Sequence, residues 1–337
     1  TAGFEGSGSV SVGAGSYTDA AGNPGGAGGD TVAIDTAAPT PSITLAANIT
    51  ADDIIDASEA GGPVAVTGTT TGARDGDVVT LTVNGTAFTG TVSGGAFSIN
   101  VTGAALTADA DLTIDASVLA TDAAGNSATA TDSETYTVDT TAPSVTVDIV
   151  DAALNVADTS SNVTFTFSEA PVGFVVGDVT VSGGTLSAFT ATADPLVYTA
   201  TFTATAGFEG SGSVSVGAGS YTDAAGNPGG AGGDTVAIDT SAPTPTITLA
   251  ANITADDIIN AAEAGGNVAV TGTVTGAQDG DVVTLTVNGT DYTGTVSSGA
   301  FSINVGGADL AADTTIAASV LATDAAGNSA TATDSET

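Results

Sequence analysis

Apolar and polar side chains alternate along most of this chain, the pattern of β-strands that bury one face. VVTLTVNG at 78–85 places Val or Leu at every second position and ends in Asn84-Gly85, a dipeptide typical of a two-residue hairpin turn. NVTFTFSEA at 162–170 alternates in the same way. Because such strands are short and turn residues recur every ~8–12 positions, the sequence predicts an all-β fold of immunoglobulin-like β-sandwiches with about seven strands each.

Few stretches depart from the strand pattern. DIIDASEA at 53–60 fits one helical turn, and nothing else is expected to be helical, including the Gly- and Ala-rich connection at 102–111. DVTVSGGTL at 178–186 is expected to supply a further strand, and the polar stretch at 151–161 a loop. The chain is 42% hydrophobic, and because that content alternates we reject disorder.

The chain contains a long internal repeat. Residues 1–36 return unchanged at 205–240, and residues 117–135 return at 319–337. A period of about 200 residues is too long for a solenoid and fits a pair of domains of about 100 residues each. We therefore predict two alternating domain types in an extended rod. The predicted modules are the C-terminal part of a type-two domain at 1–38, a type-one domain at 39–141, a type-two domain at 142–241, and a type-one domain with an incomplete last strand at 242–337.

Two short motifs recur where the predicted modules meet. The motif Asp-Thr-x-Ala-Pro, which we name the joint, occupies residues 35–39, 139–143 and 239–243. The motif TDAAGN, which we name the Asp–Asn loop, occupies residues 18–23, 121–126, 222–227 and 323–328. Each motif alone is an ordinary turn sequence. Their recurrence in two domain types that otherwise differ in sequence indicates a shared role.

The chain is strongly acidic. Asp and Glu together number 38 against a single basic residue, Arg74, and the net charge is -37. Phosphate contacts need Lys and Arg, so the charge rules out nucleic acid as a partner and argues against binding to anionic membrane surfaces. No apolar run approaches the ~18–20 residues that span a bilayer, so direct membrane insertion is excluded too. The acidity has two explanations, a soluble surface or a set of cation ligands.

The residue types favour calcium among the metals. The chain has no His and no Cys, which zinc and copper prefer, and it can form no disulfide. Ca²⁺ takes about six to eight oxygen ligands from carboxylates, amides and backbone carbonyls, whereas Mg²⁺ is possible but tends to keep its waters. A secreted chain without disulfides needs another source of stability, and bound metal can supply it.

The order of loops in a sandwich groups the candidate ligands. With strands lettered A to G, the BC and FG loops share the pole where the preceding joint enters, and the AB and EF loops share the pole where the following joint leaves. The ligands predicted around the first joint are Asp35, Asp75, Asp77, Asp122 and Asn126. Those around the second joint are Asp52, Asp53, Asp56, Glu59, Asp139, Glu169, Asp178, Asp223 and Asn227. Those of the second type-one domain are Asp239, Asp279, Asp281, Asp324, Asn328, Asp256, Asp257 and Glu263.

Several motifs resemble the tandem bacterial Ig-like repeats of giant RTX-type surface adhesins. DDIIDASEA at 52–60 and DDIINAAEA at 256–264 are similar to one repeat type. FSEA with the following GF at 167–174 and SYTDAAGNPG at 220–229 are similar to another. The resemblance covers essentially the whole chain. Because Thr1 already lies in a strand-like pattern, we interpret the sequence as part of a longer protein.

The resemblance implies a structural extender, or stalk, on a bacterial cell surface. It implies secretion by the type I route of a Gram-negative bacterium, stiffening by calcium, and projection of distal ligand-binding domains for adhesion or biofilm formation. The implied partners are calcium ions and neighbouring repeats of the same chain.

The residue types of the chain also bear on catalytic and binding functions. A Ser nucleophile would have no His or Lys base, so the chain is predicted not to be an enzyme. Two non-catalytic alternatives stay open: a calcium-dependent carbohydrate- or surface-binding adhesin module, and a subunit of a self-assembling surface filament or layer. Near-identical repetition favours the extender, because a binding module is usually unique in its chain.

Overall fold

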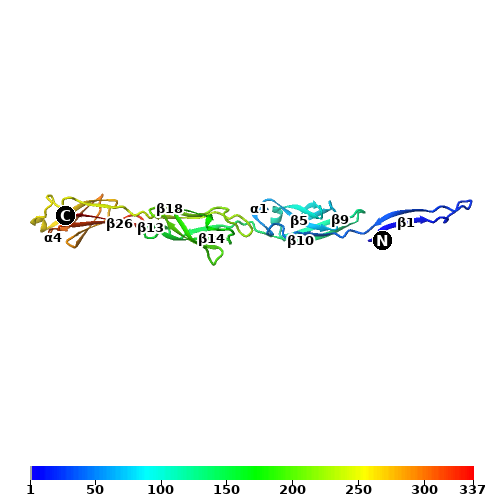
Figure 1. The fold of residues 1–337 in the computed structure, drawn as a ribbon, viewed down its shortest axis with the longest axis horizontal. Coiled ribbons are helices and arrows are strands. Elements are labelled where there is room, and N and C mark those ends of the chain that lie inside the picture. The colour runs from blue at the N-terminus through cyan, green and yellow to red at the C-terminus, as the bar shows by residue number, and fades with distance from the viewer. Residues whose placement is uncertain (1) are drawn as a thin grey trace. The chain divides into compact units, whose positions relative to one another are not determined.

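The computed structural model describes residues 2–337, and strands are its main secondary structure, as the alternation predicts (Figure 1). Contacts between Cα atoms divide the chain into two compact units. The first unit is Thr1–Ala142 with Thr222–Pro228, and the second is Pro143–Tyr221 with Gly229–Thr337. The Asp–Asn loop at 222–227 therefore groups with the residues before the second joint.

The first unit contains a hairpin and a type-one sandwich. The hairpin pairs β1 (Glu5–Val12) with β2 (Gly28–Asp35). One sheet of the sandwich has the order β3 (Ser42–Leu45), β5 (Pro63–Thr71) and β8 (Ala96–Thr102). The other has the order β10 (Ser127–Thr135), β9 (Thr113–Thr121), β6 (Val78–Val83) and β7 (Thr86–Thr91). A short parallel pair, β4 (Ile54–Ile55) with β11 (Thr137–Val138), closes one end.

The second unit contains a type-two sandwich and a second type-one sandwich. One type-two sheet has the order β12 (Val145–Ile149), β14 (Ser160–Phe167), β17 (Val197–Ala204) and β16 (Gly184–Ala191). The other type-two sheet has the order β13 (Ala153–Asn155), β19 (Gly232–Asp239), β18 (Glu209–Val216) and β15 (Val179–Ser182). One sheet of the second type-one sandwich has the order β20 (Thr246–Leu249), β21 (Asn267–Thr275) and β24 (Ala300–Gly306). Its other sheet has the order β23 (Thr290–Thr295), β22 (Val282–Val287), β25 (Ile316–Thr323) and β26 (Ser329–Glu336). The all-β, immunoglobulin-like fold class is thus confirmed.

The apolar side chains at alternate strand positions form the cores of the domains, as the sequence predicts. In the first type-one domain Val66, Val79 and Leu81 have no exposed surface, and they point inward from the two facing sheets. Gly68 sits where Phe97 crosses the strand: a Cβ there would lie 2.4 Å from the ring and 2.5 Å from the Thr44 carbonyl oxygen. Three separate clusters of buried side chains form, within residues 43–138, 145–238 and 247–320. The four module boundaries drawn from the sequence stay a prediction.

Short helices are more numerous than predicted. The turn expected at 53–60 is present as α1 (Ala57–Ala60), and α3 (Ala261–Ala264) repeats it. The expectation of no other helix is wrong, because α2 (Gly103–Thr107) and α4 (Gly307–Ala312) occupy the connection that follows β8 and β24. Packing overrides the weak local signal there: Leu106 is fully buried, and the N–H of Gly103 donates to the Gly62 carbonyl at 2.7 Å.

The type-two domain corrects two further expectations. Residues 178–186 do not form one strand: η1 (Val176–Asp178) and β15 come first, the chain turns at Gly183 with a φ of 72°, and β16 joins the other sheet. A positive φ is a conformation that Gly adopts without strain. The loop expected at 151–161 contains the short strand β13, which pairs in parallel with β19. No helix within residues 2–337 is long and apolar enough to cross a membrane.

Candidate metal sites at the joints

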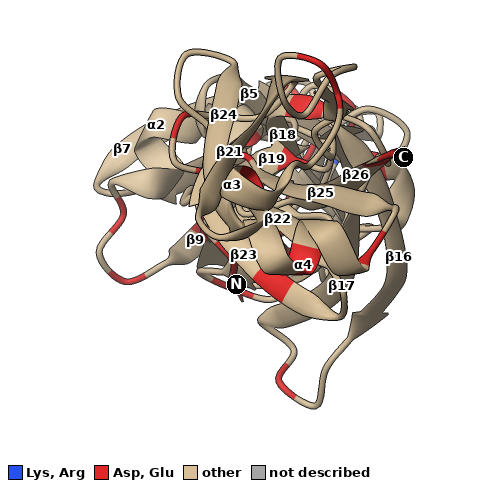
Figure 2. Cartoon of the chain, turned by 90° about the vertical axis from the view of Figure 1, so that its left-hand side faces the viewer, with Lys and Arg blue, Asp and Glu red and all other residues tan. Residues whose placement is uncertain are grey.

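Many acidic residues lie in loops and at strand ends, where the ribbon is red in Figure 2. The Asp–Asn loop is the most regular of these places. In the copy at 121–126 the Asp122 carboxylate accepts from the N–H groups of Ala124 and Asn126, both at 2.9 Å. The Asn126 side-chain amide donates to the second carboxylate oxygen at 2.8 Å. Gly125 has a φ of 93°, so the loop needs Gly at this position.

The same side-chain pair closes the other three loops. The side-chain amide of Asn donates to the loop Asp in Asn23 to Asp19, Asn227 to Asp223 and Asn328 to Asp324, at 2.8–2.9 Å. The motif therefore folds into one rigid loop wherever it occurs, which orients both side chains before any metal binds.

In three of the four loops these hydrogen bonds lower the pKa of the Asp carboxyl. At Asp122 and Asp19 the hydrogen bond from the Asn side chain lowers the pKa, and backbone N–H groups add to the effect. At Asp324 burial raises the pKa, but hydrogen bonds from Asn328 and from backbone N–H groups outweigh it, so the net shift is downward. An ionised carboxylate is the form that binds a cation.

The joints lie against these loops, as the order of loops predicts. The side-chain amide of Asn227 donates to the Asp139 carbonyl at 2.8 Å, and that of Asn328 donates to the Asp239 carbonyl at 3.0 Å. Asn126 makes the same contact with the Asp35 carbonyl at 3.2 Å. Each joint Asp is thus held by the Asn of the Asp–Asn loop that follows it.

Two of the Asn side chains also hold the domain before the joint. The Asn227 amide oxygen accepts from the N–H of Ala57, the first residue of α1, at 2.7 Å. The Asn328 amide oxygen accepts from the N–H of Val156 at 2.7 Å. The exposed fraction of these side chains is only 1% and 2%. We name this three-way contact the asparagine clamp.

Carboxylates come together beside the clamp at the second joint. Asp139 and Asp223 each offer an oxygen, and the two oxygens lie within 4.8 Å of one another. Asp223 is buried and Asp139 half-buried, so their repulsion is screened less than at an open surface. A cation between them would reverse the sign of that interaction. Glu169 belongs to the second unit, and its role as a ligand stays a prediction.

The predicted BC-loop ligands have local partners instead. Asp75 accepts from the N–H of Gly94 and Asp77 from that of Arg74, both at 2.7 Å. Asp279 and Asp281 repeat these contacts with Ser298 and Gln278, also at 2.7 Å. Asp178 accepts from Val175 at 2.8 Å. These bonds fix turns, and metal binding by these residues stays a prediction.

The acidic AB loop holds its own backbone in shape. Asp56 accepts from the N–H of Glu59 at 2.8 Å while Glu59 accepts from that of Asp56 at 3.3 Å, a capping box at the start of α1. Asp52 and Asp53 accept from Ile54 and Ile49. Burial raises the pKa of Glu59, and the nearby charges of Asp56 and Asp52 raise it further. Asp256, Asp257 and Glu263 make the corresponding contacts in the second copy.

Four residues with structural hydrogen bonds were not found from the sequence. Asn155 donates from its side-chain amide to the Ala326 carbonyl at 2.9 Å, and no motif marks it. Asp132, Asp234 and Asp334 each accept, at 2.8 Å, from a backbone N–H on the first strand of their own module. The signal for these three was available: an Asp on the last long strand of every module.

The chain is similar in sequence and structure to known bacterial proteins. A family model described as a bacterial Ig-like domain matches residues 139–240. The chain is 39% identical to the solved structure of a Ca²⁺-stabilized adhesin that helps an Antarctic bacterium reach out and bind ice, with 95% of this chain and 79% of that chain covered and a TM-score of 0.57. The chain belongs to the bacterial Ig-like repeats of large adhesins, which confirms the resemblance seen in its motifs.

Two further solved structures that are similar to this chain come from ice-binding adhesins. One, concerned with host cell surface retention of a 1.5-MDa bacterial ice-binding adhesin, is 36% identical, with 89% of this chain and 97% of that chain covered and a TM-score of 0.49. A bacterial immunoglobulin-like domain from the M. primoryensis ice-binding adhesin is 48% identical, with 30% of this chain and 100% of that chain covered and a TM-score of 0.29. The comparison with curated proteins finds no match.

Proposed function

We propose that this chain is a length of the structural extender of a large bacterial surface adhesin, stiffened by Ca²⁺ at its joints. The observation that carries the proposal is the second joint. There Asp139 and Asp223 bring carboxylate oxygens to within 4.8 Å beside the asparagine clamp. The first and third joints repeat the contact between the Asn side chain and the joint Asp.

The donor set fits calcium. Asp139 uses one carboxylate oxygen to accept from the N–H of Thr141 at 3.0 Å, and a carboxylate oxygen has further lone pairs for a cation. The nearby groups are carboxylates, amide oxygens and backbone carbonyls, and the chain has no His or Cys. Hard oxygen donors in flexible number suit Ca²⁺ better than Mg²⁺, which demands octahedral geometry and keeps water. Full coordination would draw on the remaining predicted acids and on water.

Stiffening follows from what the joint already contains. The N–H of Asp139 donates to the Ile55 carbonyl at 3.0 Å, which fixes the joint to the preceding domain. Pro143 ends the joint with a restricted φ. A cation held by the joint Asp and by the loop Asp adds a link that the backbone alone does not provide. A ligand that binds only the ordered joint stabilises it by about 2.7 kcal/mol at a concentration 100-fold above Kd.

The proposed setting is outside the cell. The repeats are proposed to act through calcium and through neighbouring repeats, without catalysis, to hold distal ligand-binding domains away from the bacterial surface. The relative from an Antarctic bacterium is described as Ca²⁺-stabilized, which supports the same role for calcium here. Secretion by the type I route and a part in biofilm formation belong to the same proposal.

Calorimetric titration tests calcium binding directly. The 337-residue chain in EDTA-free buffer should bind Ca²⁺ with release of heat. Mg²⁺ at equal concentration should not displace the bound Ca²⁺. The double variant Asp139→Asn, Asp223→Asn should lose at least one site. Asp19→Asn is the matched control, because Asp19 lies in an Asp–Asn loop with no joint contact among those of residues 2–337. Unchanged stoichiometry in the double variant would refute the assignment of the site.

A further inference from the structure

The third joint is bridged by an asparagine of the type-two sandwich. Asn155 ends β13, and its side-chain amide donates to the Ala326 carbonyl, in the Asp–Asn loop of the second type-one sandwich, at 2.9 Å. The amide oxygen of the same side chain accepts from the N–H groups of Ala157 and Asp158, at 2.9 and 3.0 Å. Both ends of the amide are therefore used, and a direct hydrogen bond links the two sandwiches across the joint.

Asp56 occupies the same place at the second joint. Strand β4 ends at Ile55 and pairs in parallel with β11, as β13 pairs with β19. A Cβ on Gly226 of the Asp–Asn loop would lie 3.3 Å from an Asp56 carboxylate oxygen. A Cβ on Gly327, the matching Gly of the third joint, would lie 3.9 Å from the Asn155 amide nitrogen. The two side chains thus face the same point of the loop, one as a carboxylate and the other as an amide.

The exchange of an amide for a carboxylate removes a donor. Asn155 donates to the Ala326 carbonyl, whereas the carboxylate of Asp56 has only acceptors to offer the loop. The residue that matches Ala326 is Ala225, which is buried. Oxygen acceptors that face one another repel unless a donor or a cation lies between them. The second joint therefore lacks the bridge that closes the third.

The two joints also differ in charge. The second joint adds the carboxylate of Asp56 to those of Asp139 and Asp223. At the third joint the joint Asp and the loop Asp recur, but the neutral Asn155 replaces the additional acid. Within residues 2–337, no three acidic side chains at the third joint have oxygens within 4.8 Å of one another. A bound cation therefore stabilises the second joint more than the third.

We propose that the residue at this place decides whether a joint depends on calcium. Asn155 closes the third joint through its amide, and Asp56 makes the second joint depend on Ca²⁺. This inference rests on the proposed function and refines it, because it assigns the calcium dependence to one of the two joints. Removal of Ca²⁺ should loosen the second joint and leave the third as it is.

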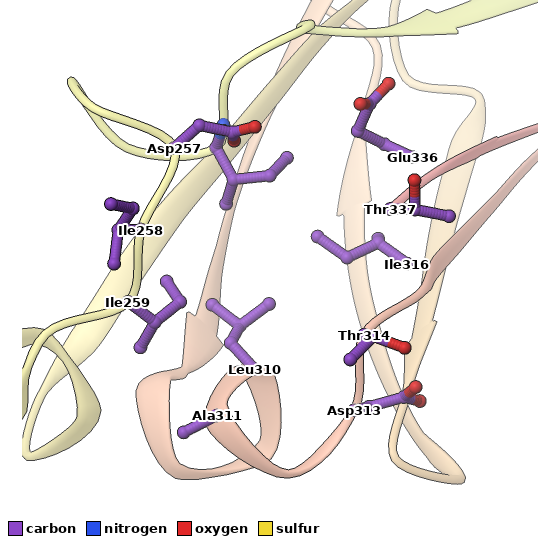
Figure 3. Close-up of a pocket in the computed structure, with 11 residues that line it drawn as sticks. Asp257, Ile258, Ile259, Leu310, Ala311, Asp313, Thr314, Ile316, Glu336 and Thr337 are labelled. Atoms are coloured by element: carbon purple, nitrogen blue, oxygen red, sulfur yellow. The ribbon is translucent and has the colours of Figure 1, made fainter.

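The second type-one copy shows that Asn is tolerated at the position of Asp56. The repeat places Asn260 there, and Asn260 caps α3 by accepting from the N–H of Glu263 at 3.1 Å, as Asp56 caps α1. The preceding Ile259 lines a pocket together with Leu310 (Figure 3), and the matching residues of the first copy share one buried cluster. Exchange of Asp and Asn at this position is therefore compatible with the fold.

Hydrogen exchange of the 337-residue chain, in millimolar Ca²⁺ and in EDTA, tests the proposal. In the parent chain the Ala57 amide should exchange at least about tenfold faster in EDTA, and the Val156 amide should change by less than about twofold. Asp56→Asn should remove the calcium dependence at Ala57, and Asn155→Asp should create it at Val156. Asn260→Asp is the matched control: it makes the same exchange at a cap whose hydrogen bonds lie outside both joints, and it should alter neither amide.

The results at the two amides distinguish this inference from the calcium proposal. Calcium dependence at both amides of the parent chain would overturn this inference and leave calcium binding standing. Calcium dependence at neither amide would overturn the calcium proposal and this inference with it. Asn155→Ala in EDTA gives a second reading if Asn155→Asp does not fold. Loss of the bridge should speed exchange at Val156 about fivefold, a factor typical of one hydrogen bond, and an unchanged rate would overturn the inference.

Discussion

The asparagine clamp should stabilise the second joint even without metal. Asn227→Ala removes three hydrogen bonds at once: from Ala57 N–H, to the Asp139 carbonyl and to the Asp223 carboxylate. At roughly 0.5–1.5 kcal/mol each, these three bonds sum to about 1.5–4.5 kcal/mol. We expect a loss in the lower half of that range, because Ala57 is exposed and water can reach its N–H.

Hydrogen exchange in EDTA measures this loss at the joint itself. The Ala57 amide should exchange about 30-fold faster in Asn227→Ala, the factor that corresponds to about 2 kcal/mol. Asn23→Ala is the control: Asn23 is exposed, and within residues 2–337 its side chain bonds only to Asp19. An Ala57 amide whose exchange rate is the same in Asn227→Ala as in the parent chain would refute the clamp.

An isosteric change separates the clamp from the metal. Asn227→Asp keeps an acceptor for the Ala57 N–H but loses both donors and adds a charge beside Asp139 and Asp223. In EDTA this variant should be less stable than Asn227→Ala, because the like charges repel. In millimolar Ca²⁺ the order should reverse, since the new carboxylate can bind the cation. The same order in both buffers would contradict a cation site at this joint.

Three further outcomes are expected. The pKa of the Asp122 carboxyl is lowered in the folded protein, so the ionised carboxylate stabilises the fold above the unfolded pKa of about 3.9. This stabilisation is lost as the pH falls through the pKa of the folded protein. Asn126→Ala should therefore weaken the acid dependence of Tm, measured between about pH 6 and pH 2 in EDTA. Gly68→Ala should cost about 1–3 kcal/mol in urea unfolding, because its Cβ would meet Phe97 and Thr44; an unchanged urea midpoint would show that the strand relaxes freely. Ca²⁺ should raise Tm more than Mg²⁺ at equal concentration, and an equal rise would argue for non-specific screening of the acidic charge.

Strands and joints could be predicted because local pattern and loop order determine them. Alternation identifies the buried face of β6, and the contact of Asn227 with Asp139 follows from the place of the FG loop in a sandwich. The short helix α2 was missed because Leu106 is held by the core rather than by local propensity. The switch of sheets at Gly183 was missed because a Gly in a strand-like run marks a bend only once the partner strands are known.

Ligands were harder to predict than the fold. The two type-one copies are nearly identical, so almost every residue recurs and recurrence does not separate a ligand from a turn former. Asp75 and Asp223 look alike in sequence, yet Asp75 accepts from Gly94 in its own turn whereas Asp223 faces a joint. Asn155 acts through its place in the fold, which a single sequence does not display.

Small-angle scattering of the 337-residue chain, in millimolar Ca²⁺ and then in EDTA, tests the central claim most directly. The account predicts a longer maximum dimension and a narrower distribution of shapes in Ca²⁺, both lost in EDTA and both absent in the Asp139→Asn, Asp223→Asn variant. Superimposable profiles in the two buffers, from a chain that remains folded, would contradict stiffening of the joints by calcium.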